Sequence, residues 1–334
     1  MTRFIKIKTL LFVIFLILPL QIEAQDKQNL SENADGSYVN NNGVNLWFRV
    51  EGIDNLNSIP IILIHGGPGA TARPFEKTIG PELAKERRVI YMDYRGTGRS
   101  DRPTDAQKYS FEILASDIEA IRNELDIEKL SLFGHSNGAA TAVTYARKYS
   151  EHVASLILCC PLLSPVDLEM NMIHKIALSP SEVYEDARTI YKSDQPMASK
   201  FGSLLGLINK ETRYSFQYYN TDNSLVLNKI QDDFKEELGK DLMEPSLMKG
   251  LISNGFFEFD AFKYASELSM PVLLLLGRYD SEISLENSMK FALTVPDGYV
   301  NVLNESGHHP YVEQTKETVL EINTFINRKV DQLK

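Results

Sequence analysis

Gly134-His135-Ser136-Asn137-Gly138 is the stretch that most narrows the fold of this 334-residue chain. It follows the apolar run Leu130-Ser131-Leu132-Phe133 and precedes an Ala-rich stretch of helical character. A serine with a glycine two positions away on either side, between a strand and a helix, is typical of a sharp, strained turn that lifts the hydroxyl clear of a sheet. Taken alone, the pattern fits an ordinary strand-to-helix turn equally well. Its interpretation therefore depends on the rest of the chain.

Short β-like runs alternate with helix-like stretches along the chain. The runs cover residues 61–64, 89–92, 130–133, 156–160, 272–276 and 300–303. Apolar residues at helical spacing predict helices over residues 75–88, 111–125, 139–149 and 318–330. A turn signal, Asn40-Asn41-Asn42-Gly43, predicts a hairpin near the start. Strands that alternate with helices predict an α/β fold with a mostly parallel central sheet flanked by helices.

The alternation stops between residues 164 and 262. This segment reads as several helices and loops, and it lies between two predicted strands. We interpret it as a mainly helical cap inserted into the fold. Residues 37–163 and 263–334 then form the core, and the polar residues 25–36 form a linker that precedes it.

Residues 1–24 have the plan of a secretory signal peptide. Arg3, Lys6 and Lys8 precede an apolar run at residues 10–20, and the small residue Ala24 ends the segment. The run is shorter than the roughly 20 apolar residues that a membrane span needs. We expect export to the periplasm or beyond, with no membrane association after cleavage. An uncleaved N-terminal anchor is the alternative.

The chain after this leader is acidic. The whole chain holds 35 basic and 45 acidic residues, and the leader accounts for three basic residues and one acidic residue, which leaves 32 and 44, a net charge of -12. Such a charge does not suit nucleic acid or anionic lipid, so we expect a small molecule or a short peptide as the partner. The only cysteines, Cys159 and Cys160, are adjacent on a predicted strand and point to opposite faces, so we interpret them as core thiols.

Two glycine-rich motifs follow predicted strands, at the sheet edge where ligands bind in such folds. In His65-Gly66-Gly67-Pro68-Gly69 the glycines free the backbone to present N–H groups to an oxyanion, with a second donor at the N–H of Asn137. A simple Gly-Pro turn is the alternative. The second motif, residues 93–100, lacks the spacing of nucleotide-binding loops, so we interpret it as a structural loop held by internal bonds of Asp93 and Arg95.

An acid and a histidine follow two later strands. Asp280 ends Gly277-Arg278-Tyr279-Asp280, and His308 lies in Ser306-Gly307-His308-His309. Taken alone, Asp280 also fits a helix-capping aspartate, and His308 also fits an ordinary surface histidine. Together with Ser136 they follow the order nucleophile, acid, histidine. We therefore predict a serine hydrolase in which His308 is the general base and Asp280 orients its ring, with no metal and no organic cofactor.

The chain resembles the α/β-hydrolases from about residue 37 to residue 333, with the cap matched only in position. The motif at residues 65–69, together with Asp93-x-Arg95-Gly96-x-Gly98-x-Ser100, resembles the proline iminopeptidase branch, whose members cleave N-terminal residues, often proline, from peptides. The resemblance implies that Gly67 donates to the oxyanion and that His308, not His309, is the base. Better-known members of that branch carry an aromatic residue after the nucleophile, where this chain has Asn137.

These observations predict an exported serine aminopeptidase that works through an acyl-enzyme. The alternative is an esterase, lactonase or amidase with the same three residues. A non-enzymatic binding protein on this fold would be expected to lack one of the three, and all are present. An aminopeptidase must also bind a substrate ammonium, for which carboxylates are best suited. Among the acidic residues in and near the cap we favour Glu258 and Glu282, and we interpret most of the others as a solvated helix face.

Overall fold

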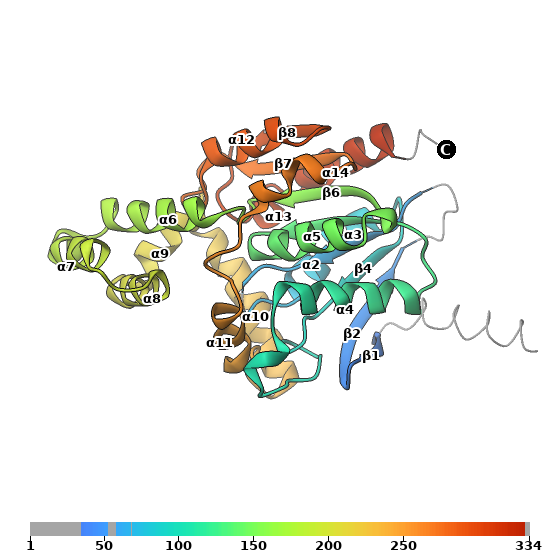
Figure 1. Ribbon diagram of the computed structural model, residues 1–334, viewed down its shortest axis with the longest axis horizontal. Coiled ribbons are helices and arrows are strands. Elements are labelled where there is room, and N and C mark those ends of the chain that lie inside the picture. The colour runs from blue at the N-terminus through green and yellow to red at the C-terminus, as the bar shows by residue number, and fades with distance from the viewer. Residues whose placement is uncertain (1–34, 53–57, 68, 331–334) are drawn as a thin grey trace, which may run out of the picture.

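Within residues 35–52, 58–67 and 69–330, which the computed structural model describes, eight strands form one sheet in the order β1-β2-β4-β3-β5-β6-β7-β8 (Figure 1). The hairpin of β1 (Ser37–Asn41) and β2 (Val44–Glu51) is antiparallel, and β2 is antiparallel to β4. All later pairs are parallel. The predicted mostly parallel sheet is therefore confirmed, while the predicted signal peptide and most of the linker lie outside the described residues.

The six strands that complete the sheet coincide with the apolar runs of the sequence. Four of them are buried at every position, as expected for parallel strands covered on both faces. Their bounds are β3 (Ile61–Ile64), β4 (Val89–Met92), β5 (Leu130–His135), β6 (Val153–Cys159), β7 (Val272–Gly277) and β8 (Gly298–Leu303).

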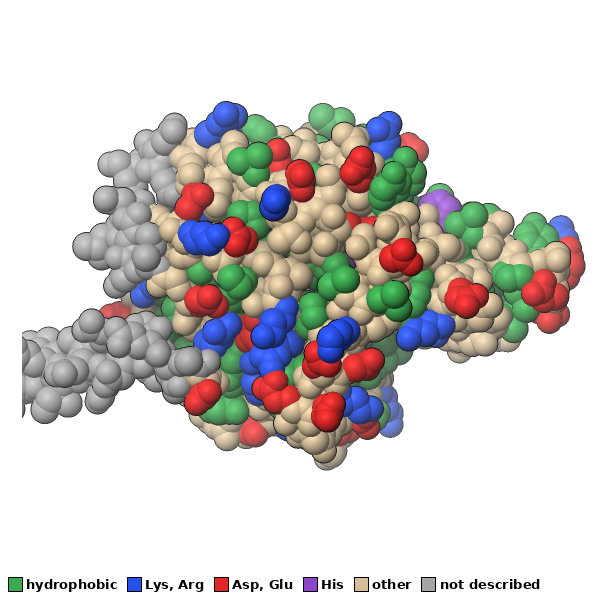
Figure 2. Space-filling view, turned by 180° about the vertical axis from the view of Figure 1, so that it is seen from behind, with side chains coloured by type: hydrophobic (Ala, Val, Ile, Leu, Met, Phe, Trp, Pro, Cys, Tyr) green, Lys and Arg blue, Asp and Glu red, His purple; other side chains and the backbone are tan. Residues whose placement is uncertain are grey.

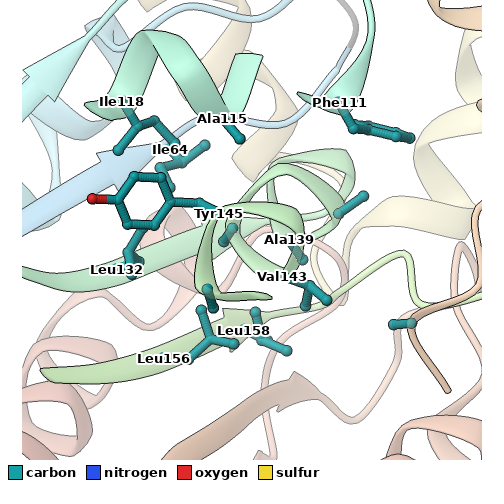
Figure 3. Packing of buried hydrophobic residues seen from close by; sticks show 14 of the residues in the cluster. Ile64, Phe111, Ala115, Ile118, Leu132, Ala139, Val143, Tyr145, Leu156 and Leu158 are labelled. Carbon is teal, nitrogen blue, oxygen red and sulfur yellow. The ribbon is translucent and has the colours of Figure 1, made fainter. Parts of the chain in front are cut away.

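Two hydrophobic clusters pack helices on the two faces of the sheet. Ile62 and Ile64 of β3 belong to the cluster that includes α4 (Phe111–Glu124), α5 (Asn137–Lys148) and α12 (Leu285–Thr294) (Figure 3). Ile61 and Leu63, which point the other way, belong to the cluster on the opposite face. That cluster takes in α2 (Arg73–Lys77), α3 (Ile79–Leu83), α13 (Pro310–Glu313) and α14 (Thr315–Lys329).

The single helix predicted over residues 75–88 is wrong: two short helices, α2 and α3, stand there, and Thr78 between them has φ -127° and ψ -100°. Pro81 explains the break. A proline inside a helix has no N–H to donate and its ring collides with the carbonyl four residues earlier, which here belongs to Lys77.

The segment between β6 and β7 forms six α-helices. In Figure 1 the helices α7 and α8 stand well away from the sheet, whereas α10 and α11 lie against the core. Ser164 caps the first of the six, and Asp167 completes the capping box, which fixes where the segment leaves the sheet. The bounds are α6 (Pro165–Ala177), α7 (Ser181–Lys192), α8 (Met197–Leu207), α9 (Lys210–Gln217), α10 (Asn223–Leu238) and α11 (Pro245–Ser253).

Charged side chains of both signs are interspersed over the face of the molecule seen from behind in Figure 2, so the acidic excess is not gathered into one patch there. A search of the helices that the structure describes finds none with the length and apolar character to cross a membrane.

The loop at residues 93–100 is structural, as predicted, but its two charged residues have different partners. Asp93 accepts hydrogen bonds from the Arg99 side chain at 2.7 Å and from the N–H of Ala72 at 2.8 Å, which ties the loop to the segment after the glycine motif. Arg95 leaves the loop and forms a two-pronged ion pair with Asp117 of α4, at 2.7 and 2.6 Å. The expectation that Arg95 bonds within its own loop is therefore wrong.

We expect Asp117→Ala to lower the free energy of unfolding by about 3–5 kcal/mol, because it leaves the fully buried Arg95 guanidinium without its counter-charge. Urea unfolding followed by circular dichroism measures this. Glu124→Ala removes an exposed carboxylate from the same helix and is expected to change stability by less than about 0.5 kcal/mol. An equal loss in the two variants would contradict the role given to the buried pair.

Candidate active site

Ser136 stands alone between the end of β5 and the start of α5, in the strained turn that the sequence predicts. Its φ of 53° and ψ of -121° lie in a region that non-glycine residues rarely adopt. The flanking glycines permit the turn because a Cβ at Gly134 would lie 2.8 Å from the carbonyl oxygen of Gly138, and one at Gly138 would lie 2.5 Å from that of Ile64. The glycine spacing therefore reflects the close approach of α5 to the strands.

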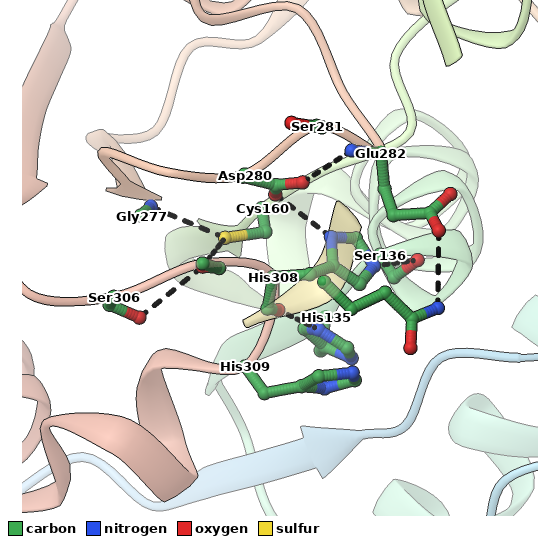
Figure 4. A network of polar contacts seen from close by, with 12 residues as sticks. His135, Ser136, Cys160, Gly277, Asp280, Ser281, Glu282, Ser306, His308 and His309 are labelled. Atoms are coloured by element: carbon green, nitrogen blue, oxygen red, sulfur yellow. Dashed lines mark hydrogen bonds and ion pairs between the residues drawn. The ribbon is translucent and has the colours of Figure 1, made fainter. Parts of the chain in front are cut away.

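A chain of hydrogen bonds joins Ser136, His308 and Asp280, the three residues that their order in the sequence predicts to act together (Figure 4). Nε2 of His308 lies 2.9 Å from Oγ of Ser136, and Nδ1 of His308 lies 2.8 Å from Oδ2 of Asp280. Each residue comes from a different loop, after β5, β7 and β8, at the same edge of the sheet. The neighbouring His309 takes no part, since its Nδ1 lies 3.0 Å from the hydroxyl of Tyr311.

The electrostatic setting of His308 suits a general base. Burial lowers the pKa of His308, but the charge of Asp280 and the hydrogen bond to it outweigh burial, so the pKa lies above the ordinary 6.5. Asp280 is itself held by the N–H of Glu282, which donates to its Oδ1 at 2.7 Å. The arrangement can take a proton from the Ser136 hydroxyl and stabilise the imidazolium that results.

The pH dependence of kcat/KM should show the raised pKa of His308. His308 must be neutral to accept the proton of Ser136, so activity is lost as the pH falls through its pKa. Because that pKa is raised, we expect the acid limb of the profile to have its inflection above pH 6.5. Initial rates with an uncharged ester between pH 5 and 9 measure it. An inflection below 6.5 would contradict the pairing of His308 with Asp280.

Two buried side chains beside the hydrogen-bonded chain hold the loops in place, and the sequence did not reveal them. The thiol of Cys160 donates to the carbonyl of Gly307 at 3.6 Å and accepts from the N–H of Gly277 at 3.4 Å, so it bridges the loops of Asp280 and His308. His135 donates from Nε2 to the carbonyl of His308 at 2.8 Å. Burial lowers the pKa of His135, so its ring is neutral and donates through one nitrogen.

One group of residues in the described part of the chain has the spacing to hold a metal ion. It consists of Cys160, Asp280 and His308, whose ligand atoms lie within 4.8 Å of one another. Asp280 and His308 are already joined by the hydrogen bond described above. The thiol pKa of Cys160 is raised by burial, which disfavours the thiolate that a metal would need.

A cavity of about 1030 Å³ opens over Ser136. The two predicted oxyanion donors, Gly67 and Asn137, line it together with Ser136. Asn137 is the first residue of α5, so its N–H has no carbonyl of the same helix to bond. The backbone of Gly66 packs directly on the turn, since a Cβ there would lie 2.9 Å from Cβ of Ser136. Apolar side chains from the cap form much of the remaining wall, among them Leu168, Phe201, Leu227, Met243, Phe256 and Phe257.

The structure treats the two favoured carboxylates differently. Glu282 lines the cavity, but its Oε2 lies 2.8 Å from the ammonium of Lys175 and also accepts a hydrogen bond from Asn171. Gln217 donates to its Oε1 at 3.1 Å. Glu258 does not line the cavity and is exposed, because Phe256 and Phe257 turn inward and the next side chain turns outward. The expectation that Glu258 is near substrate is therefore wrong.

The ion pair with Lys175 keeps the carboxyl group of Glu282 ionised. Burial raises the pKa of Glu282, but the Lys175 charge, the charge of His308 and the hydrogen bonds outweigh burial, so the pKa lies below its ordinary value and the group is ionised. The other carboxylate of the cavity wall, Asp241, is also paired, with Lys235 at 2.6 Å. Arg213 lines the cavity too and makes no ion pair with any residue that the structure describes. The carboxylates of the cavity wall are thus each compensated by a cation.

The end of helix α9 joins the cap to both loops that carry the acid and the histidine. The carbonyl of Gln217 accepts from the N–H of His308 at 2.6 Å, and that of Phe216 accepts from the N–H of Ser281 at 3.0 Å. The cap therefore forms a wall of the site and also fixes the loops beneath it.

The chain belongs to the alpha/beta hydrolase fold family, whose sequence profile matches residues 59–315 and so includes Ser136, Asp280 and His308. Among curated proteins it is similar to the proline iminopeptidase of Heyndrickxia coagulans, with 25% identity over 275 residues that cover 82% of this chain and 92% of that protein. It is likewise similar to the 2-hydroxy-6-oxo-2,4-heptadienoate hydrolase of Pseudomonas putida, with 25% identity over 278 residues that cover 80% of this chain and 88% of that protein.

Solved structures show the same architecture. The proline iminopeptidase-related protein of Thermus thermophilus has a TM-score of 0.72 and 20% identity, and the match covers 88% of this chain and 98% of that one. At this identity the likeness concerns the fold alone. The predicted α/β-hydrolase fold and the resemblance to proline iminopeptidases are therefore confirmed.

Proposed function

We propose that this protein is a serine hydrolase that works through an acyl-enzyme. The hydrogen-bonded chain from Ser136 through His308 to Asp280 carries the proposal. Oγ of Ser136 attacks the substrate carbonyl carbon while its proton passes to Nε2 of His308, and Asp280 stabilises the imidazolium. His308 then gives the proton to the leaving group. A water molecule, deprotonated by His308, attacks the acyl carbon; the bond from that carbon to Oγ breaks, His308 returns the proton to Oγ, and the acid and free Ser136 result.

The backbone N–H groups of Gly67 and Asn137 are the proposed donors to the oxyanion of the tetrahedral intermediate. Both residues line the cavity beside Ser136, and such a donor contributes about 2.7–4 kcal/mol to transition-state stabilisation. The left-handed φ of Gly67, 116°, supports this role, because it turns the backbone in a way that a residue with a side chain rarely adopts.

The charges of the cavity disfavour a substrate ammonium, so esters or amides of small acyl groups without an ammonium are the proposed substrates. Apolar side chains form much of the wall, and its two carboxylates are paired with Lys175 and Lys235. A substrate ammonium would find no carboxylate of the described cavity wall that lacks a counter-charge. The Pseudomonas putida relative is named for a heptadienoate, an anion with no ammonium in its name, and this agrees with a cavity that does not select for a cation.

An aminopeptidase that releases N-terminal proline or another small residue is the second candidate. The similarity to proline iminopeptidases over 82% of the chain favours it, and so does the presence of an ionised Glu282 in the cavity wall. The two candidates share the same three residues and differ in what the cavity must recognise.

A substrate panel separates the candidates. We expect turnover of p-nitrophenyl butyrate, and no measurable turnover of proline or alanine p-nitroanilide. Anilide turnover that disappears when the N-terminus is acetylated would establish the aminopeptidase instead. Failure of every ester and anilide, with no labelling of Ser136 by a fluorophosphonate probe, would remove the serine hydrolase proposal altogether.

A further inference from the structure

Lys175 is a buried cation next to the proposed active site, and it is not a member of the proton relay. It lies on α6, and its side chain is only 2% exposed. Its ammonium lies 2.8 Å from Glu282 and donates to the amide oxygen of Asn171. The rings of Phe201 and Phe216 flank it, with centroids 5.6 and 5.5 Å from Nζ.

A lysine is buried at this depth only when its charge is compensated, and here the partner is Glu282. Lys175 is not among the residues that line the cavity, whereas Glu282, Asn171 and Gln217 are. The ammonium therefore lies behind the cavity wall and neutralises the half-buried carboxylate of Glu282 from the rear. Glu282 also contacts the acid of the relay directly, since its own N–H donates to the Asp280 carboxylate.

The hydrogen-bonding capacity of Glu282 is nearly used up. A carboxylate accepts about four hydrogen bonds, and the donors already present are Asn171, Lys175 and Gln217. A substrate ammonium would meet a carboxylate that is nearly saturated with hydrogen bonds and electrically neutralised. Without Lys175 the same carboxylate would hold an uncompensated negative charge in a poorly solvated wall, where attraction to a cation is strong.

We propose that Lys175 is a specificity-determining residue that makes this site prefer uncharged acyl groups over acyl groups that carry an ammonium. Lys175 supplies Glu282 with the cation that a peptide N-terminus would otherwise provide. The proposal rests on the proposed function, namely that Ser136 hydrolyses acyl substrates in this cavity, and it identifies the residue that sets the substrate class.

The test uses two methyl esters of the same shape. L-Alanine methyl ester carries an ammonium where methyl isobutyrate carries a methyl group, and acid release from both is followed in a pH-stat at pH 7. We expect the unmodified enzyme to prefer methyl isobutyrate in kcat/KM. In Lys175→Met the ratio of the two kcat/KM values should move about 10- to 100-fold toward the alanine ester, the range of a charge-assisted hydrogen bond.

A second substitution shows whether the effect passes through Glu282. Adding Glu282→Gln to Lys175→Met removes both charges, and we expect the ratio to return toward that of the unmodified enzyme. Lys229→Met is the matched control, because it also removes a lysine from an ion pair of the cap, the exposed pair with Asp233 at 2.9 Å. It should leave the ratio within about twofold of the original. A general loss of packing would lower both kcat/KM values without moving their ratio.

An unmoved ratio in folded Lys175→Met would overturn the inference while leaving the proposed function standing. If the unmodified enzyme hydrolyses neither of these esters nor p-nitrophenyl butyrate, and Ser136 is not labelled by a fluorophosphonate probe, the proposed function itself fails. If Lys175→Met does not fold, the unmodified protein still tests the inference. Isobutyramide and L-alaninamide are then compared as competitive inhibitors of p-nitrophenyl butyrate hydrolysis. We expect isobutyramide to inhibit at the lower concentration, and the opposite order would overturn the inference.

Discussion

Replacing Ser136 by alanine is expected to lower kcat on p-nitrophenyl butyrate by about a millionfold, the loss measured when the nucleophile of a comparable serine hydrolase is removed. The substitution deletes the Oγ that lies 2.9 Å from Nε2 of His308, so no acyl-enzyme can form. What activity remains would come from the N–H groups beside the cavity acting on bound substrate and water. The residual kcat is measured with the purified variant at high concentration, after the esterase background of the preparation has been subtracted.

Ser203→Ala is the matched control for that experiment, because Ser203 is an exposed serine of α8 that does not line the cavity. Its kcat should equal that of the unmodified enzyme. A Ser136→Ala variant that retains a tenth or more of the activity would contradict the assignment of the nucleophile.

Asp280→Asn is expected to lower kcat by about 10⁴-fold with little loss of stability. Asparagine preserves the shape and can still accept the hydrogen bond from the N–H of Glu282, but it cannot stabilise the imidazolium and it favours the wrong tautomer of His308. The charge of Asp280 is the main cause that raises the pKa of His308. The acid limb of the residual activity should therefore move to lower pH.

Asp233→Asn provides the comparison, since it neutralises an exposed aspartate on α10 outside the cavity. We expect it to change neither kcat nor the pH profile. If Asp280→Asn behaved in the same way, the acid of the relay would have to be another residue.

The site could be predicted from the sequence to the extent that local chemistry fixes it. Gly134 and Gly138 mark the turn because no other residue fits between α5 and the strands. Asp280 and His308 were found because each follows a buried strand, and parallel strands bring their ends to one edge. The order of the three residues along the chain then gave each its role.

What the sequence did not reveal depends on contacts between distant segments. The sequence marks Glu282 as a carboxylate that could bind a substrate ammonium, but Lys175, 107 positions away, reaches it from α6. The bridge of Cys160 to Gly277 and Gly307 spans 117 and 147 positions, and neither cysteine carried a sign of it. Pro81 lies inside the helix predicted over residues 75–88, and helical spacing of apolar residues alone does not show that a proline divides it.

Labelling with a fluorophosphonate probe, followed by peptide mass spectrometry, tests the account most directly. The probe phosphonylates a serine only where a base has activated the hydroxyl. We predict one adduct per chain, located on Ser136, with labelling lost in Ser136→Ala and strongly slowed in His308→Ala. An enzyme that hydrolyses p-nitrophenyl butyrate while Ser136 stays unlabelled, or that is labelled elsewhere, would contradict the account.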